Sequence, residues 1–463
     1  MRQSKAPRTD PEPTNTRNVT IGVFGHYGNE NLGDEAIVEA SIRNIRKHLP
    51  DARIICFSLR PNDTEARYGL QAHPVRNMVD DGISRLAEME MERKHRTPDS
   101  LGERVAEPDR TKTFAGKLKA ALKTVPIFYS LARLVAALPQ AIWRLGLEIG
   151  FLWRSRTVLK RVDLLFIAGS NQFLDNFGGA WSYPYTLLKW TLLAKSTGTK
   201  VAFVSVGAGP LSARMSKLMI RTALALADYQ SVRDKQSKAL LRGGEHTDFP
   251  LVYPDLAFSL PMNDDELTRV RTKPTVGINL MPVYNERYWF LPDQEKYRRY
   301  VSRMAEFAAF VAQEGYPTFF FSSQPYDELV IDDVTDALTN MGLDRKHVPA
   351  RAKPSNTVTE LMEVVRRADV VVATRFHGTV LALHAHRAVL GVCYQLKAIQ
   401  LLEDMGQKEY AFHLDDFRTE DLKHGFQRLA GNLEEQVERI RRRHAEYQRA
   451  LDEQYGNVLR LLA

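Results

Sequence analysis

Arg375 and His377 stand at the end of the segment ADVVVATRFHG (368–378), directly after an apolar run. The run is typical of a strand buried in a parallel sheet. A charge at the end of such a strand is costly to bury unless a partner neutralises it. Arginine is a planar bidentate donor for carboxylates and phosphates, and histidine exchanges protons near neutral pH. The pair therefore predicts an anion site with an adjacent acid or base.

The intervening Phe376 sets how the two side chains are expected to point. If strand geometry continues, Arg375 and His377 alternate across Phe376 and face the same side. The alternative interpretation is a helix-capping histidine beside a surface arginine. Ligands of open α/β sheets bind beyond the carboxyl ends of strands, which favours the functional interpretation.

A glycine-rich turn, GHYGNENLGDE (25–35), joins an apolar strand to a helix. Its glycines allow close backbone approach by a ligand, and the N terminus of the helix favours an anion. The spacing is neither a dinucleotide fingerprint nor a Walker loop. The helix dipole explains Asp34 and Glu35 as well as a ligand does. Candidate contacts in this turn are Gly28, Asn29, Asn31, Gly33, Asp34 and Glu35.

Further turns follow other apolar strands. Asn171 ends AGSN (168–171), and Gly207 and Gly209 lie in SVGAGPL (205–211). Arg233 follows a short alternating run, where Asp234 is available to pair with it. From the residues alone, that structural ion pair is the better interpretation of Arg233.

Several chemistries have no matching pattern. His384 and His386 are spaced i, i+2 in the expected helix, so they should not share a helical face, and no metal site is expected. No HExxH, CxxC or GxSxG motif occurs. Cys56 and Cys393 lie in apolar runs and are interpreted as buried thiols in a reducing compartment.

The elements that must position these residues form two series. Strand, turn, helix and strand alternate from residue 18, and a second such series begins near residue 274. This pattern predicts two α/β domains that face each other across a cleft. We expect a disordered lead at 1–17, domains at 18–265 and 270–425, and an amphipathic helix at 430–463. An insertion interrupts the first domain at about 80–161.

The net charge of +8 is concentrated in that insertion. Residues 91–161 hold 15 Lys and Arg against 6 Asp and Glu, or +9, which leaves −1 elsewhere. A general nucleic-acid binder does not normally confine its positive charge to one segment in this way, so no nucleic-acid partner is expected. Apolar helices there carry Phe128, Tyr129, Trp143, Phe151 and Trp153. They predict peripheral contact with an anionic membrane, or else a helical lid. No secretory or membrane-spanning segment is recognised, so a cytoplasmic location is expected.

Taken in order, the segments GHYGNENLGDEAIV, SVGAGPL, YQSVRDKQS, YPDLAF and the stretch from ADVVVATRFHG to LLEDMG resemble the polysaccharide pyruvyl transferase family. The resemblance covers roughly 19–410 without the insertion. Two positions depart from the family pattern: AGSN stands where a glycine run is frequent, and Phe376 stands where leucine is common.

This resemblance implies two Rossmann-like domains, as in GT-B glycosyltransferases, and transfer of pyruvate from phosphoenolpyruvate to a sugar as a cyclic ketal. The acceptor would be a sugar or lipid-linked oligosaccharide of a surface or exopolysaccharide precursor, and no cofactor is implied. The resemblance assigns donor binding to Arg233, Arg375, Phe376, His377 and Lys397. His377 is the expected proton carrier, with Asp34 as the second candidate. The alternatives are a nucleotide-sugar glycosyltransferase and a non-catalytic glycan- or phosphate-binding protein.

Overall fold

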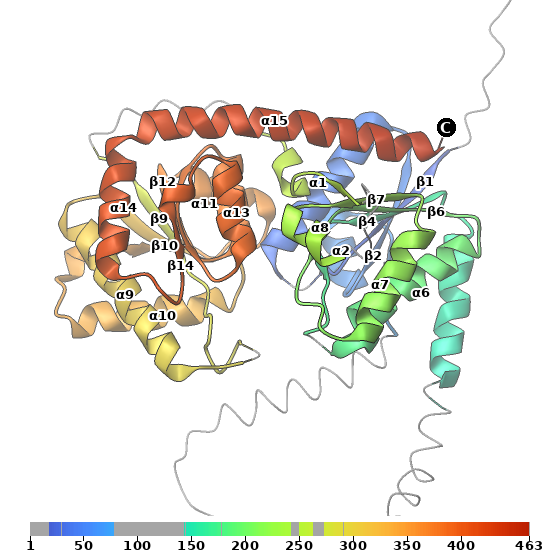
Figure 1. Cartoon of the computed structure of the whole chain (residues 1–463), viewed down its shortest axis with the longest axis horizontal. Coiled ribbons are helices and arrows are strands. Elements are labelled where there is room, and N and C mark those ends of the chain that lie inside the picture. The colour runs from blue at the N-terminus through green and yellow to red at the C-terminus, as the bar shows by residue number, and fades with distance from the viewer. Residues whose placement is uncertain are drawn as a thin grey trace, which may run out of the picture.

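Short, buried apolar strands form two separate sheets in the computed structural model of the chain (Figure 1), and every strand pairing in them is parallel. The structure describes residues 18–28, 30–77, 143, 145–176, 178–241, 250–262, 273–289 and 291–462. The predicted lead at 1–17, Asn29 and most of the insertion lie outside these ranges.

The N-terminal sheet has the order β3-β2-β1-β4-β6-β7-β8, with β5 beside β6. Its strands are β1 (Thr20–Phe24), β2 (Arg53–Ser58), β3 (Ala72–Pro74), β4 (Leu164–Ala168), β5 (Asn171–Phe173), β6 (Lys200–Ala208), β7 (Tyr229–Val232) and β8 (Leu251–Val252). The helices of this domain are α1 (Leu32–His48), α2 (Pro61–Tyr68), α6 (Tyr183–Lys195), α7 (Arg214–Leu226) and α8 (Lys235–Leu241).

The C-terminal sheet has the order β11-β10-β9-β12-β13-β14. Its strands are β9 (Val276–Asn279), β10 (Thr318–Phe321), β11 (Ala350–Arg351), β12 (Val370–Ala373), β13 (Ala388–Cys393) and β14 (Ala411–His413). Its helices are α9 (Gln294–Gln313), α10 (Asp327–Asn340), α11 (Val358–Arg366), α12 (Phe376–His384), α13 (Leu396–Asp404) and α14 (Thr419–Gly431). The two sheets form the predicted pair of Rossmann-like domains.

Each sheet reverses its strand order at one point, between β1 and β4 in the first and between β9 and β12 in the second. Connections diverge to opposite sides there, which leaves a crevice beyond the carboxyl ends of the strands. The candidate turns follow these four strands and their neighbours. The fold therefore brings segments from both halves of the sequence to one place.

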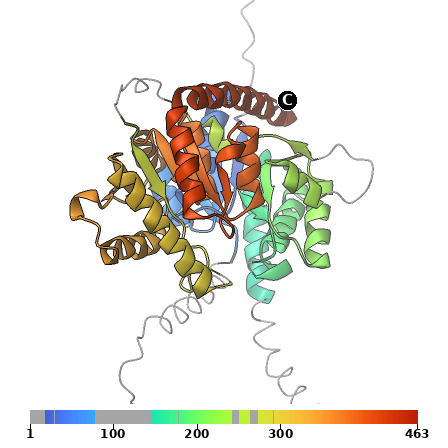
Figure 2. The ribbon, with the colours of Figure 1, turned by 60° about the vertical axis from the view of Figure 1, so that its left-hand side comes forward.

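The last helix, α15 (Leu433–Leu459), spans both domains (Figures 1 and 2). On the C-terminal domain, ring nitrogens of His384 and His386 lie 3.0 and 3.2 Å from those of His444 in α15. On the N-terminal domain, Gln454 of α15 forms hydrogen bonds with Ser231 and Ser205. The buried side of α15 includes Ile440 and Leu451, as its periodicity predicts. The helix thus connects the two domains through buried polar contacts.

The expectation that His384 and His386 both lie in the helix is wrong. Helix α12 ends at His384, and His386 lies beyond it with a φ of 57°. That turn brings both rings onto His444 of α15. Among the described residues, no group of three or more His, Cys, Asp or Glu side chains has the geometry to hold a metal ion.

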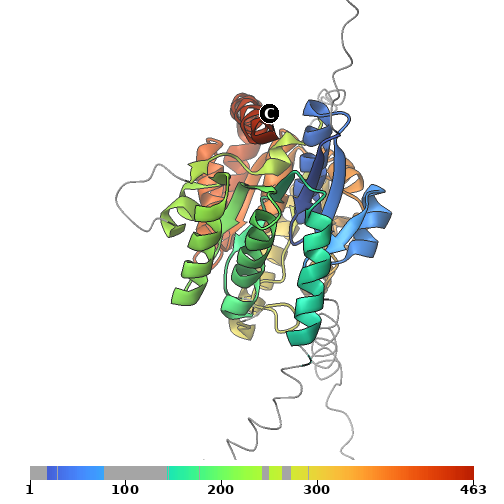
Figure 3. The same ribbon diagram turned by 90° about the vertical axis from the view of Figure 1, so that its right-hand side faces the viewer.

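The described part of the insertion is a helix over 145–159, on the side of the N-terminal domain turned away from the C-terminal domain (Figure 3). Phe151 is buried, whereas Trp143 and Trp153 are 54% and 72% exposed. Phe128 and Tyr129 lie outside the described residues, so membrane contact stays a prediction. No described helix is both long and apolar enough to cross a bilayer.

Candidate functional site

A cavity of about 490 Å³ lies where the carboxyl ends of the two sheets face each other. Its lining comes from both domains. It includes eight of the residues singled out in the sequence: Asn31, Asp34, Asn171, Arg233, Arg375, Phe376, His377 and Lys397. The strand-end turns therefore converge on one space, as the topology of the sheets requires.

The local geometry at Arg375 differs from the strand alternation expected there. Arg375 has extended backbone angles and is the N-cap of α12, which begins at Phe376. His377 therefore sits in the first helical turn. The first turn of α12 can pack closely on the end of β9 because residue 378 is a glycine. A Cβ at Gly378 would lie 2.2 Å from Asn279 Oδ1. Arg375 and His377 still line the same cavity, by way of a helix start instead of a continued strand.

Arg375 is held by a buried carboxylate at the start of α10. Its Nε donates to Asp327 Oδ1 at 2.5 Å, and Tyr288 Oη lies 3.4 Å from Nη1 and Nη2. Asp327 also accepts from the backbone N–H of Ser323 at 2.9 Å. Burial alone would lower the pKa of Arg375, but Asp327 and then Tyr288 raise it above its ordinary value. The guanidinium is thus a fixed, permanently charged group.

Arg233 follows β7 and is paired with a second buried carboxylate, that of Asp255. Its Nη1 donates to Asp255 Oδ2 at 3.0 Å, while Asp234, the partner expected from sequence, lies farther away at 3.8 Å from Nε. Arg233 Nε is buried and has no hydrogen-bond partner within the described ranges. Gly207 makes room for this side chain, because a Cβ there would lie 2.5 Å from Nε.

The ring of Phe376 contacts two cations from different elements. Arg233 Cζ is 4.5 Å from the ring centroid, and Lys397 Nζ is 5.0 Å from it. Both contacts are cation–π interactions. Burial, and then the charge of Arg233, lower the pKa of Lys397 to about 7. Phe376 therefore helps to hold two like charges at one end of the cavity.

His377 contacts the N-terminal domain. Its Nε2 is 3.8 Å from Asp255 Oδ2, and no described group forms a hydrogen bond with that nitrogen. Burial, followed by the cations Arg233, Lys397 and Arg375, holds the pKa of His377 well below its usual range. The imidazole is therefore neutral near pH 7.

Asp34 lies half-buried in the first turn of α1. Asn31, the N-cap residue, donates from Nδ2 to Asp34 Oδ2 at 2.7 Å and accepts from Gly33 N–H at 3.2 Å. Burial is the main reason that the pKa of Asp34 is raised, to about 7. Gly33 allows α1 to approach α12, because a Cβ there would lie 2.4 Å from the Cβ and Nδ1 of His377.

Five of the predicted contacts that the structure describes lie outside the cavity lining: Gly28, Gly33, Glu35, Gly207 and Gly209. Glu35 is buried and accepts from Gly28 N–H at 2.8 Å and from Tyr68 Oη at 2.6 Å, so it supports the turn from behind. Gly28 has a φ of 85°, which a side chain rarely adopts. Gly209 packs beside Asn171, whose Nδ2 would lie 2.9 Å from an added Cβ. These residues shape the site without lining it.

Sequence reasoning gave no role to several residues that the structure places at the site. Asp255 and Asp327 hold the two arginines, and His26, Tyr288 and Tyr394 line the cavity. Asp255 belongs to YPDLAF and Asp327 to the turn after FFFSS, so both follow strand-like runs. Position at a strand end was therefore the available signal for these two carboxylates.

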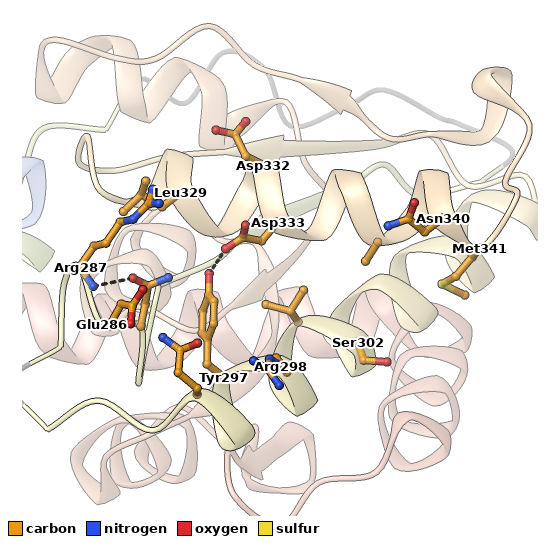
Figure 4. Close-up of a pocket in the computed structure, with 14 residues that line it drawn as sticks. Glu286, Arg287, Tyr297, Arg298, Ser302, Leu329, Asp332, Asp333, Asn340 and Met341 are labelled. Atoms are coloured by element: carbon orange, nitrogen blue, oxygen red, sulfur yellow. Dashed lines mark hydrogen bonds between the residues drawn. The ribbon is translucent and has the colours of Figure 1, made fainter. Parts of the chain in front are cut away.

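A second cavity, of about 590 Å³, lies between α9 and α10 on the C-terminal domain (Figure 4). Tyr297 donates a hydrogen bond to Asp333 there, and Arg298 and Asp332 also line it. It is larger than the cleft cavity but contains none of the converging cations. The chemistry of the converging side chains, and not the volume, identifies the cleft as the candidate site.

Comparisons with known proteins show the family and the fold of the chain. A family model described as polysaccharide pyruvyl transferase matches residues 31–395. No curated protein matches the chain significantly. Solved structures share the fold at low identity. A UDP-GlcNAc 2-epimerase from Neisseria meningitidis bound to UDP-GlcNAc is 10% identical, with a TM-score of 0.53 over 95% of this chain and 99% of that one. The epimerase from Methanocaldococcus jannaschii is 12% identical, with a TM-score of 0.50 over 88% and 91%.

Proposed function

Because the chain belongs to the polysaccharide pyruvyl transferase family, we propose that it transfers pyruvate from phosphoenolpyruvate to a sugar as a cyclic ketal. Phosphoenolpyruvate is proposed as the donor because three cations, Arg233, Arg375 and Lys397, line one cavity. Phosphoenolpyruvate bears a carboxylate and a phosphate, so it needs several cations in fixed positions. Two arginines locked by buried carboxylates supply bidentate donors that need little reorganisation on binding.

The proposed reaction adds two sugar hydroxyls to one carbon. Protonation of the methylene carbon forms a methyl group, and one hydroxyl attacks the adjacent cationic carbon with loss of its proton. Phosphate leaves with the electron pair of its C–O bond, and a second hydroxyl attacks and loses its proton. One released proton restores the acid, and the other ends on phosphate. The atoms and charges balance without a redox partner or cofactor.

His377 is the proposed acid toward the methylene carbon, and Asp34 is the second candidate. The cations that depress the pKa of His377 are those that the donor would neutralise, so donor binding raises that pKa. Asp34, with a pKa of about 7, is partly protonated at neutral pH before the donor binds. Phe376 helps to position two of the donor-binding cations, Arg233 and Lys397, through cation–π contacts.

The proposed acceptor is a sugar or a lipid-linked oligosaccharide of a surface or exopolysaccharide precursor. A peripheral position at the inner face of the membrane would bring the enzyme to such an acceptor, with residues 91–161 as the contact. The exposed Trp143 and Trp153 support this proposal.

The second candidate is a nucleotide-sugar glycosyltransferase, which the fold favours because a structural neighbour holds UDP-GlcNAc. The direct test measures phosphate released from phosphoenolpyruvate with a panel of lipid-linked and nitrophenyl sugars, and the product mass. A ketal product gains the mass of pyruvate less water. A product that gains a sugar mass from a nucleotide sugar would establish the second candidate, and binding without turnover would indicate a binding protein.

A further inference from the structure

His26 has no role in the proposed function, although it lines the same cavity. It lies just after β1, is 4% exposed, and its ring centroid is 3.8 Å from that of Tyr183. Its Nε2 is buried and has no hydrogen-bond partner anywhere in the described chain. A buried polar nitrogen without a hydrogen-bond partner lowers the stability of the protein. Such a nitrogen in the lining of a ligand cavity is therefore a candidate for contact with the ligand.

The tautomer of His26 follows from its neighbour Gln172. Gln172 Nε2 donates to the Ala168 carbonyl at 2.6 Å, which orients the amide and leaves Oε1 facing His26 Nδ1 at 3.2 Å. Since an amide oxygen only accepts, Nδ1 must carry the proton. Nε2 of the neutral ring then holds a lone pair. Burial, and then the charge of Arg76, hold the pKa of His26 well below its usual range, so the ring stays neutral.

Different cations act on the two histidines of the cavity. Arg76 is the charge that acts on His26, whereas Arg233, Lys397 and Arg375 act on His377. The ring of Tyr183 is tilted by 39° against that of His26, and the pKa of Tyr183 is influenced by Arg76 and by Asp34. Asp34 in turn is influenced by Arg233 and Lys397. The part of the lining around Phe376 is a cationic end, with Arg233 and Lys397 against the ring, whereas His26 contacts Tyr183 and Gln172.

The cavity also offers unused acceptors for hydroxyl groups. Asn176 Oδ1 and Gln395 Oε1 line it and, like His26 Nε2, have no partner among the described residues. Three unpaired acceptor atoms suit a ligand with several O–H donors, such as a sugar. Tyr183 and Trp289 also line the cavity, and aromatic side chains are suited to packing against the C–H groups of a sugar ring.

We infer that His26 marks the acceptor subsite, where its Nε2 binds the attacking sugar hydroxyl and takes its proton. This inference rests on the proposed function for the identity of the reaction. In the first addition, the acceptor oxygen bonds to the carbon that bears phosphate, the O–H bond breaks, and the proton passes to Nε2. The electron pair of the carbon–carbon double bond takes a proton from the acid at the cationic end. His377 is then the acid, and His26 is the base.

Two substitutions separate the properties of the ring. His26→Asn puts an amide nitrogen near the position of Nδ1, so it keeps the bond to Gln172 and lacks Nε2. His26→Gln reaches the position of Nε2 with an acceptor oxygen that cannot take a proton. His73→Asn is the matched control, since His73 is a half-buried histidine of the same domain that bonds Ser155 and lies outside the cavity lining.

The experiment records thermal stability, phosphoenolpyruvate affinity by calorimetry, and turnover with the best sugar of the panel. Separately, it records binding of nitrophenyl glucoside, galactoside and mannoside without the donor. We expect unchanged donor affinity in all variants, and a fall in kcat of about 10²–10⁴-fold in both His26 variants. Sugar binding should weaken in His26→Asn and recover in part in His26→Gln, while His73→Asn behaves as wild type.

The outcomes distinguish the inference from the proposed function. Wild-type kcat in folded His26→Asn, or full kcat in His26→Gln, would overturn the role of His26 as base. Unchanged sugar binding in His26→Asn would overturn the subsite. If the wild-type protein binds a nitrophenyl sugar through His26 but never releases phosphate, the proposed transfer fails and the sugar subsite stands.

Discussion

Arg233 and Arg375 each hold a buried carboxylate, so each arginine has a structural role as well as a proposed donor-binding role. Substitution by alanine would leave that carboxylate unpaired and confuse loss of binding with loss of stability. Lysine keeps the charge but not the planar fork. Arg→Lys is therefore the informative change at both positions.

We expect Arg375→Lys and Arg233→Lys each to weaken phosphoenolpyruvate binding without unfolding the protein. Loss of charge-assisted hydrogen bonds worth about 1.5–3 kcal/mol corresponds to a rise in Kd of about 10- to 160-fold. Calorimetric titration measures this directly. Arg351→Lys is the control, because Arg351 pairs with Glu328 and Asp332 at the surface. Wild-type donor affinity in folded Arg375→Lys would contradict the assigned site.

His377 is tested by a change that preserves its size and polarity. His377→Gln should retain donor binding, since the arginines remain, and should lose about 10²–10⁴-fold in turnover per folded molecule. A helix-capping histidine would instead show a modest loss of stability and an unchanged rate. Near-normal turnover in His377→Gln would move the acid role to Asp34, where Asp34→Asn would then remove activity.

Lys397 predicts a specific pH dependence of donor binding. Its pKa of about 7 in the free protein reflects burial and Arg233, so the lysine loses its proton as the pH rises through 7. A bound trianion favours the charged form and raises that pKa. Binding then takes up a proton above pH 7, and affinity falls by up to about tenfold per pH unit between 7 and 9.

Calorimetry at pH 6.5, 7.5 and 8.5, in buffers of different ionisation enthalpy, measures both the affinity and the proton uptake. Lys397→Arg is the control variant, because arginine stays charged over this range and removes the part of the dependence that comes from Lys397. A wild-type affinity that does not change between pH 7 and 9 would count against Lys397 as a donor contact.

At the scale of elements, glycines decide how closely the helices and strands approach the site. Gly207 of β6 faces Arg233, Gly33 of α1 faces His377, and Gly378 of α12 faces Asn279. Each added Cβ would lie within 2.5 Å of its neighbour. The site is therefore assembled by backbone approach as well as by side-chain pairing.

Gly207→Ala should displace Arg233, whose guanidinium is held on the other side by Asp255. Overpacking of this kind costs about 1–3 kcal/mol of stability, and we expect weaker phosphoenolpyruvate binding at the same time. Gly456→Ala in α15 is the control: no described atom lies within 4 Å of its added Cβ, and alanine should stabilise the helix by up to about 1 kcal/mol. Unchanged donor affinity in Gly207→Ala would show that Arg233 tolerates movement.

At the scale of the whole molecule, α15 holds the two domains together across the cleft. Gln454 Nε2 donates to Ser231 Oγ at 2.6 Å, and Ser205 Oγ donates to Gln454 Oε1 at 3.1 Å. All three side chains are buried. Gln454→Ala should destabilise the protein by about 1–3 kcal/mol, because it leaves the buried Ser205 hydroxyl without its acceptor.

Denaturant unfolding of Gln454→Ala, followed by tryptophan fluorescence and by circular dichroism, measures this loss. Coincident transitions in the wild type and separated ones in the variant would show that α15 couples the domains. Gln448→Ala, on the exposed side of the same helix, should leave the midpoint unchanged. An unchanged midpoint in Gln454→Ala would remove the proposed coupling.

Local patterns in the sequence determined much of this architecture. The two β-α-β series predicted two facing α/β domains, and apolar runs that end in Arg375 or Asn171 located strand ends at the cleft. The family resemblance is confirmed by the match over residues 31–395. These signals are local, because strand burial and helix periodicity are set by neighbouring residues in the chain.

Only the tertiary structure decided which groups act on one another. Asp327 reaches Arg375 across 48 positions, and Gln172 sets the tautomer of His26 across 146. The chain turns into α12 at Phe376 because α12 packs on the end of β9, where strand continuation was expected. Pairing, burial and the resulting pKa shifts depend on which loops meet at two facing sheet edges. That meeting is a property of the packed domains and has no counterpart in local sequence.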